Sequence, residues 1–356
     1  PKAPAPNRRG PCYHTNACRR ESARGFAAGW QASRGWLTGL PADGANDRNG
    51  GRSPGRSSAA NLIDQGQPTK VDIPRVLVVQ HGARHRYALA AALHRAGMLE
   101  ALCTDTTAYT WVGRSARLLS RVFRRVRRLQ AVAARTVSGV PTEKIRSTDA
   151  VFWSDVFSRK APHPFHAYRR RHSVLSRRIL RRGFGRANWL YVMYNEGLDL
   201  LRAAKAQGLR TAVDVFVHPR TARLVRQEQL RFPDWPSPPL PESLIEQMES
   251  YLAQSLRLAD LITCPSEWVA EGVVDLIGPV EDRIRVVPYG SSFEPGPPST
   301  PTVGRVLFAG GDFLRKGLHY LGMAATALRE QGEQYDFRVA GAAEPAVRNH
   351  PLLRDL

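Results

Sequence analysis

The chain has 356 residues, a formal net charge of +21 and 42% hydrophobic residues, a length that allows two domains with cores of their own. No eighteen-residue apolar run occurs, and no signal-peptide-like stretch follows a basic start, so the sequence predicts a cytoplasmic protein. The four cysteines have no paired spacing, which excludes a disulfide framework and a cysteine-based zinc site.

The first part of the chain has an unusual composition. Residues 1–70 are poor in Ile, Val and Leu and rich in Gly, Pro, Arg and Ser. Such a segment buries too little apolar surface to offset the entropy of an ordered chain. We therefore expect a disordered low-complexity tail over residues 1–70, followed by a first folded domain over residues 71–295.

The first domain is predicted to open with a strand, a helix and a second strand. Arg75–Gln80 is a run of buried-strand character, His81-Gly82-Ala83 is a turn, and a helical pattern reaches Arg95. Leu99–Thr104 then supplies the second strand. Because a helix connects the two strands, we expect them to be parallel.

Two arginine-rich segments follow, over residues 114–132 and Tyr168–Arg182. In both, apolar residues recur at helical spacing and arginines fill most other positions, as in an amphipathic helix. Two interpretations are open. Either the apolar stripes pack on the sheet while the arginines face water, or the helices lie on an anionic membrane surface as a peripheral contact.

The alternation of strands and helices then continues to the end of the chain. Strands are expected at Trp189–Tyr194, Thr211–Val217, Leu261–Cys264, Ile284–Pro288, Arg305–Ala309 and Phe337–Gly341, and helices at Gly197–Gln207, Pro241–Leu258, Ser266–Leu276 and Gly317–Glu330. Gly290–Thr302 has the composition of a linker. The pattern predicts an α/β protein with parallel sheets covered by helices, and ligands beyond the carboxyl ends of the strands.

Residues 303–356 are therefore expected to start a second domain. About fifty residues is below the size at which a domain ordinarily folds alone, so we expect this second domain to be truncated. Cys103 and Cys264 lie in strand-like apolar runs, which is typical of buried, unreactive thiols.

The sharpest chemical pattern is Gly310-Gly311 followed by Arg315-Lys316-Gly317 at the expected start of a helix. Glycines after a strand allow close backbone approach, and the amides of a helix start favour an anion. Two cations against the helix dipole indicate a diphosphate ligand. The alternative is a solvated turn with a chance basic pair. The spacing is not that of a Walker A loop, and no GxGxxG follows the first strand.

Four blocks in this order resemble the retaining glycosyltransferases of family 4. They are Ala259–Ile262 with Pro265–Val269, Ile284–Gly290, Phe308–Gly311 with Arg315–Gly317, and Phe337–Gly341. The resemblance covers residues 241–341 well and residues 75–220 loosely. It implies the GT-B fold, in which two Rossmann-like domains face each other across a cleft.

The resemblance also implies an activity, namely transfer of a sugar from a nucleotide-sugar to an acceptor with retention. Arg315 and Lys316 would hold the donor diphosphate, and the pocket would be shaped by Gly310, Gly311, Tyr289 and Gly290. Fixed cations can stabilise the leaving diphosphate without a metal, so no metal or other cofactor is expected. The family's catalytic histidine matches His218, which could equally be a solvated loop residue.

Two further residues are candidates for the acceptor side. His81 follows the first strand at the crevice edge, and Glu228 lies near a proline-braced loop. Glu228 could orient an acceptor hydroxyl or form a salt bridge with a neighbouring arginine. Asp214, inside a strand, is expected to be structural.

The chain departs from the family pattern at its end. Family members carry paired glutamates further along the second domain, and Leu356 precedes that position. We therefore expect this polypeptide alone to transfer no sugar, although its full-length parent would.

The alternative function is a basic protein that binds nucleic acid or membrane without catalysis. A nucleic-acid partner is not expected, because the arginines alternate with an apolar stripe instead of stacking aromatics. The donor base, the sugar and the acceptor stay open.

Overall fold

The computed structural model describes residues 73–123, 125–158, 161, 163–290, 296, 300–342 and 344–356. The tail expected over residues 1–70 lies outside this part of the chain, and so does most of the expected linker. Arg75–Tyr289 and Gly296–Leu356 belong to one compact unit. The domain boundary expected between residues 295 and 303 stays a prediction.

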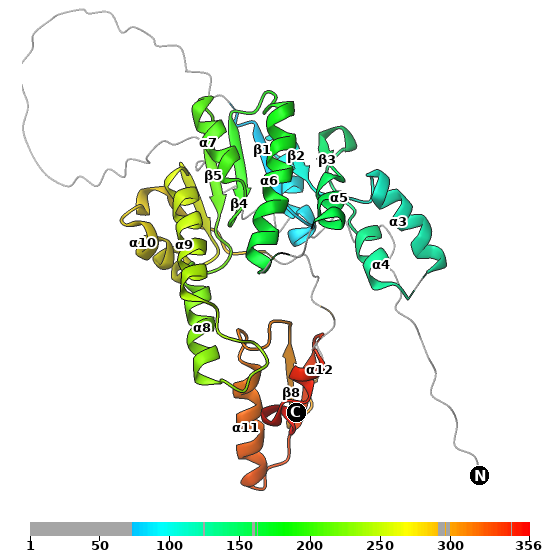
Figure 1. Cartoon of the computed structure of the whole chain (residues 1–356), viewed down its shortest axis with the longest axis vertical. Helices are drawn as coiled ribbons and strands as arrows, with labels where there is room; N and C mark the ends of the chain where they lie inside the picture. Colours follow the sequence, from blue (N-terminus) through cyan, green and yellow to red (C-terminus); the bar gives the residue numbers. More distant parts are fainter. Residues whose placement is uncertain are drawn as a thin grey trace, which may run out of the picture. The chain divides into compact units, whose positions relative to one another are not determined.

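A parallel sheet of seven strands organises the described part of the chain (Figure 1). The α/β class and the parallel sheet are therefore confirmed. In space the strands follow the order β3-β2-β1-β4-β5-β6-β7, and their bounds are β1 Val76–Gln80, β2 Leu99–Thr104, β3 Ile145–Ser147, β4 Trp189–Met193, β5 Arg210–Asp214, β6 Leu261–Cys264 and β7 Ile284–Val286.

Helices connect the strands, as parallel pairing requires. Their bounds are α2 Ala88–Arg95, α3 Trp111–Val122, α4 Arg127–Ala133, α5 Ala150–Phe157, α6 Pro164–Arg182, α7 Leu198–Ala206, α8 Thr221–Arg231, α9 Glu242–Arg257 and α10 Glu267–Ile277. Short 3₁₀ turns lie at Arg84–Tyr87, Thr142–Lys144, Glu281–Arg283 and Pro351–Leu353. Ser266 caps α10, because its hydroxyl accepts a hydrogen bond from the Val269 amide.

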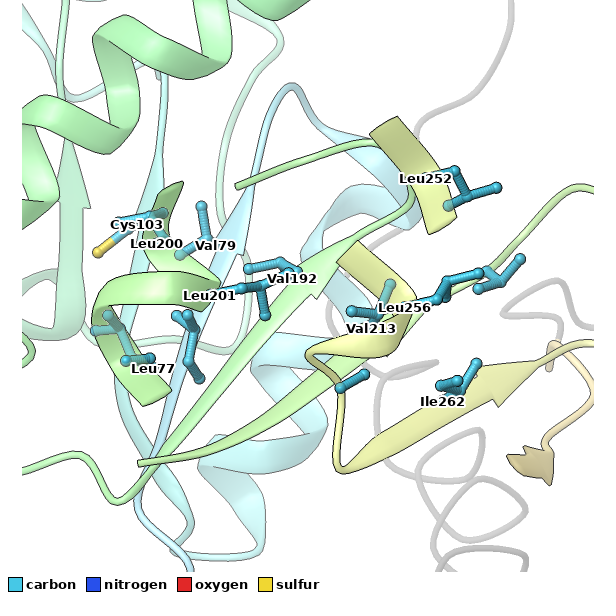
Figure 2. Packing of buried hydrophobic residues seen from close by; sticks show 14 of the residues in the cluster. Leu77, Val79, Cys103, Val192, Leu200, Leu201, Val213, Leu252, Leu256 and Ile262 are labelled. Carbon is cyan, nitrogen blue, oxygen red and sulfur yellow. The ribbon is translucent and has the colours of Figure 1, made fainter. Parts of the chain in front are cut away.

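The core lies between the sheet and the helices that cover it. Figure 2 shows Leu200 and Leu201 of α7 and Leu252 and Leu256 of α9 among strand residues from β1 to β6. Each fully buried leucine contributes about 1.5–3 kcal/mol relative to an exposed one. Cys103 and Cys264 are free and buried, and burial raises the pKa of each thiol to about 12. Both are therefore unreactive, as predicted.

The strand order fixes where ligands bind. The chain moves from β1 outward to β2 and β3, then returns to the other side of β1 to form β4. The switch point therefore lies between β1 and β4, and crevices beyond the carboxyl ends of strands at such a point are the usual ligand sites of open parallel sheets.

The prediction of a single basic helix over residues 114–132 is wrong. The helix ends at Val122, Phe123 leaves the helical conformation with φ −96° and ψ 60°, and a second helix starts at Arg127. The fold-back is held by a bond from the Gln130 side chain to the Ser120 carbonyl. After the second helix the chain returns to the sheet, where the Ala108 amide donates a hydrogen bond of 2.9 Å to the Arg135 carbonyl oxygen. Residues 108–135 are called the α3–α4 hairpin below.

The second arginine-rich segment forms one helix, α6, which starts four residues earlier than expected. Its apolar face is buried in the core through Leu175 and Ile179. Other differences from expectation are small. The strand expected to reach Val217 ends at Asp214, and the pattern missed β3, α5 and α8.

The C-terminal segment forms a second, two-stranded parallel sheet. It consists of β8 Arg305–Ala309 and β9 Asp336–Ala340, followed by α12 Pro345–Arg348, with α11 Leu318–Glu330 as the connecting helix. Phe313, Leu314 and Leu318 pack against Trp235 from the loop after α8. In the described part of the chain, no helix is long and apolar enough to cross a membrane.

Candidate functional site

Polar side chains gather at the carboxyl ends of β1, β2 and β4. His81 follows β1, Asp105 follows β2, and Asn195-Glu196 follows β4. α6 adds Tyr168 and His172. Because β1 and β4 flank the switch point, this edge cluster lies where the topology places a ligand.

Glu196 is the most deeply buried member of the edge cluster. One carboxylate oxygen accepts from the His81 amide at 3.1 Å, and the other accepts from the Tyr168 hydroxyl at 2.9 Å. The His172 ring nitrogen Nε2 lies 4.0 Å from the carboxylate. Burial raises the pKa of Glu196 to about 8. The carboxyl group can therefore gain or lose a proton near neutral pH.

His81 faces a carboxylate from the neighbouring strand. Its Nε2 lies 3.8 Å from the Asp105 carboxylate, while its buried Nδ1 has no hydrogen-bond partner. Burial is the main cause that lowers the pKa of His81. Arg135, at the end of the α3–α4 hairpin, donates to Asp105 over 2.8 Å, and the Gly82 amide donates to the same carboxylate. The His81 ring thus lies beside a carboxylate that Arg135 and the Gly82 amide hold in place.

The loop after His81 has an unusual backbone. His85, Arg86 and Tyr87 have φ values of 46°, 51° and 62°, a left-handed conformation that costs non-glycine residues about 1–3 kcal/mol each. The Tyr87 side chain is fully buried and anchors the loop. Strain of this kind clusters at functional sites, where the surrounding structure enforces it.

A second buried carboxyl group lies further along the same edge. Asp214 ends β5 and accepts hydrogen bonds from Thr263 and, over 3.4 Å, from the Tyr289 hydroxyl. Burial raises the pKa of Asp214 to about 6. The Arg84 guanidinium stacks on Phe216 at 3.3 Å from the ring centre. Tyr289 thus reaches the edge of the sheet, with its ring 4.6 Å from that of His85, and Gly290 follows it at the surface.

His218 takes a different position from His81. Its ring stacks on Trp268 at 4.1 Å and is packed against Gly272 of α10. Its Nδ1 accepts from the Arg220 amide. These contacts fix the ring against α10. A catalytic role for His218 stays a prediction.

The donor-side residues lie around the turn between β8 and α11. The Lys316 side chain passes over Gly310, where any Cβ atom would meet its Nζ at 2.6 Å, and Gly311 faces open space. Arg315 pairs with Asp312. Gly317 caps α11 in the left-handed conformation, so both cations precede the helix instead of opening it. Diphosphate binding by this pair stays a prediction.

Glu228 does not join the edge cluster. Its carboxylate accepts from the Tyr320 hydroxyl at 2.7 Å, lies 3.2 Å from His319 of α11, and pairs with Arg231 at 3.3 Å. The salt bridge weighed from the sequence is thus present, and Glu228 links α8 to α11. A role in acceptor binding stays a prediction.

Sequence reasoning missed most of the edge cluster. Asp105 directly follows a predicted strand, and Glu196 lies two residues after another and precedes a glycine and a helix. Both are recognisable positions for a functional residue in a parallel sheet. Tyr168 and His172 gave no such signal, because they lie within a helix whose contacts the sequence does not fix.

A pocket of 270 Å³ borders the cluster on its outer side. It lies between α6, α7 and α9 and is lined by His172, Arg169 and Tyr251, among others. The arginine guanidinium is stacked on the Tyr251 ring at 4.6 Å. In the described residues, no group of three or more side chains could hold a metal ion.

Comparison with known proteins gives distant structural likeness only. No protein-family model and no curated protein matches the chain. Among solved structures, LpCGTa in complex with UDP is 14% identical, with 79% of this chain and 74% of that chain covered and a TM-score of 0.40. UGT89C1 from Arabidopsis thaliana with quercetin is 14% identical, with 77% and 70% covered and a TM-score of 0.39.

A third structure gives the same picture. A UDP-glucosyltransferase from Polygonum tinctorium, in a complex with 3,4-dichloroaniline, is 14% identical, with 78% of this chain and 74% of that chain covered and a TM-score of 0.39. Likeness at this level does not assign an activity to this chain.

Proposed function

We propose that this protein transfers a sugar from a nucleotide-sugar to the hydroxyl group of an acceptor. The sheet β1–β7 would form the acceptor side of a GT-B arrangement, and residues 303–356 would start the donor side. The observation that carries the proposal is the edge cluster at the switch point, where His81 lies beside Asp105. The four sequence blocks over residues 259–341 support the same class.

The geometry supports a specific role for His81. The imidazole of His81 can accept the proton of an acceptor hydroxyl, while the Asp105 carboxylate, 3.8 Å away, stabilises the imidazolium that forms. The acceptor oxygen then bonds to the anomeric carbon of the donor as the bond from that carbon to the diphosphate breaks. The proton remains on His81, and Lys316 and Arg315 stabilise the negative charge of the leaving diphosphate.

The test uses the full-length parent protein, for which the sequence predicts activity, with UDP- and GDP-sugars. It measures release of the nucleoside diphosphate. His81→Gln should lower kcat by about 10²–10⁴-fold, the usual contribution of a general base. His94→Gln is the matched control, since His94 lies in the last turn of α2, away from the edge cluster. Equal turnover by wild type and H81Q would overturn the role of His81.

Donor binding is tested separately by calorimetry with UDP and GDP. The double variant R315A/K316A should bind at least about tenfold more weakly, because each charged contact to a phosphate contributes about 1.5–3 kcal/mol. Arg329→Ala, at the far end of α11, is the control. Unchanged affinity of the double variant would contradict the diphosphate site. The resemblance implies retention, whereas a single displacement in which His81 deprotonates an acceptor on the face opposite the diphosphate would invert the anomeric carbon. The anomeric configuration of the product, measured by NMR, decides between the two.

A further inference from the structure

The α3–α4 hairpin and α5 share an exposed apolar surface. Trp111 stacks on Trp153, which in turn stacks on Phe157. The Val112 amide at the start of α3 donates to Asp149 at the start of α5. The exposed apolar side chains include Trp111, Leu118, Val122, Phe123, Trp153 and Phe157, and three of them, Trp111, Val122 and Phe157, are 69%, 74% and 80% exposed. Exposed apolar side chains thus lie along α3 to its C-terminal end and on α5, and the stacked rings of Trp111, Trp153 and Phe157 join the two helices.

The same region carries only positive charge over its hairpin part. Between Asp105 and Glu143 the sequence has eight arginines and no acidic residue. Arg114, Arg117, Arg121 and Arg125 are exposed. Apolar side chains at the tip of a hairpin, flanked by arginines, have the chemistry of a surface that enters the headgroup region of an anionic bilayer.

We propose that the α3–α4 hairpin and α5 dock the protein on an anionic membrane surface, with Val122 and Phe123 at the hairpin tip entering the lipid. Nucleic acid fits less well, because aliphatic side chains such as Leu118 and Val122 offer no stacking partner for bases. The proposal is independent of sugar transfer, since vesicle binding needs neither donor nor acceptor.

The hairpin also connects docking to the edge cluster. The Gly113 backbone lies against the Thr107 carbonyl, so tightly that a Cβ atom would come within 1.8 Å of it. At the other end, Arg135 pairs with Asp105, which faces His81. Both ends of the hairpin are therefore fixed beside the candidate site, and docking would place that site next to the bilayer.

The test is sedimentation of the full chain with vesicles of phosphatidylcholine, with and without phosphatidylserine. We expect binding to the anionic vesicles that weakens with added salt. The triple variant L118S/V122S/F123S should lose at least about tenfold in affinity, and R117Q/R121Q should lose about as much. The control R177Q/R178Q removes two exposed arginines from α6 and should bind nearly as wild type. Because all these residues are exposed, thermal unfolding should stay unchanged.

Several results would overturn the proposal. They are no binding to anionic vesicles, equal binding to neutral ones, and an R177Q/R178Q variant that weakens binding as much as R117Q/R121Q. A DNA duplex that binds the chain more tightly than the vesicles, through the same arginines, would assign the surface to nucleic acid. A dimer in light scattering that L118S/V122S/F123S abolishes would assign it to a second copy of this chain.

Discussion

The two arginine-rich segments have the same sequence pattern, but apolar side chains are buried in one and exposed in the other. In α6 the apolar residues Leu175 and Ile179 are 2% and 4% exposed, while the arginines Arg177, Arg178, Arg181 and Arg182 are exposed. In α3 the residues Leu118 and Val122 are 64% and 74% exposed. Amphipathicity therefore shows that a helix has two faces. Whether the sheet has room for the apolar face depends on neighbours distant in sequence.

The largest expected difference between the two regions is in stability. Leu175→Ala in α6 should lower the free energy of unfolding by about 2–5 kcal/mol, because it removes a packed core side chain and leaves a cavity. Leu118→Ala in α3 should change it by less than about 0.5 kcal/mol. Urea denaturation of both variants measures the difference. Equal losses would show that α3 is packed on the protein in solution, and the comparison would break.

The second prediction concerns the polar contacts that tie α6 to the edge cluster. Burial raises the pKa of Glu196 from 4.5 to about 8, so between these values the folded chain binds a proton that the unfolded chain has lost. Stability contributed by the protonated carboxyl group therefore falls as the pH rises from about 4.5 to about 8. Glu196→Gln should remove this loss. Its free energy of unfolding should therefore rise by about 2–4 kcal/mol relative to that of wild type as the pH goes from 5 to 8.

Denaturation at several pH values measures this effect. The exposed Glu143 provides the control, because Glu143→Gln should leave the pH dependence as in wild type. If the difference between E196Q and wild type stayed constant across this pH range, Glu196 would not be the group that titrates.

The third prediction concerns Gly113, where the start of α3 packs closely on the backbone before it. Gly113→Ala should cost about 1–3 kcal/mol, since the added methyl group meets the Thr107 backbone and the helix must shift. Ser115→Ala, two residues further along, should be nearly neutral. Urea denaturation of the pair separates a specific contact from a general effect on α3. Equal stability of G113A and wild type would show that the hairpin is not fixed at this end.

The strands and the layered α/β plan could be predicted from the sequence because runs such as Arg75–Gln80 and Leu261–Cys264 are short, apolar and bounded by turns. The break at Phe123 could not, because neither glycine nor proline marks it and the helical spacing of apolar residues continues across it. β3 has only three residues at the edge of the sheet, too few for a periodic signal.

The site was predictable in the same uneven way. His81 could be found because it directly follows a strand, whereas the contact of Glu196 with Tyr168 joins residues 28 positions apart. Such a contact depends on how α6 lies over the sheet. The burial that raises the pKa of Glu196 is likewise a property of the packed structure and has no local pattern.

The bond between Ala108 and Arg135 brings the two ends of the hairpin within 2.9 Å of each other. A segment whose ends meet can be exchanged, lengthened or removed while the strands on either side keep their places. The stretch between Gly113 and Arg135 can therefore change in length or sequence while the sheet and the ion pair between Arg135 and Asp105 stay in place.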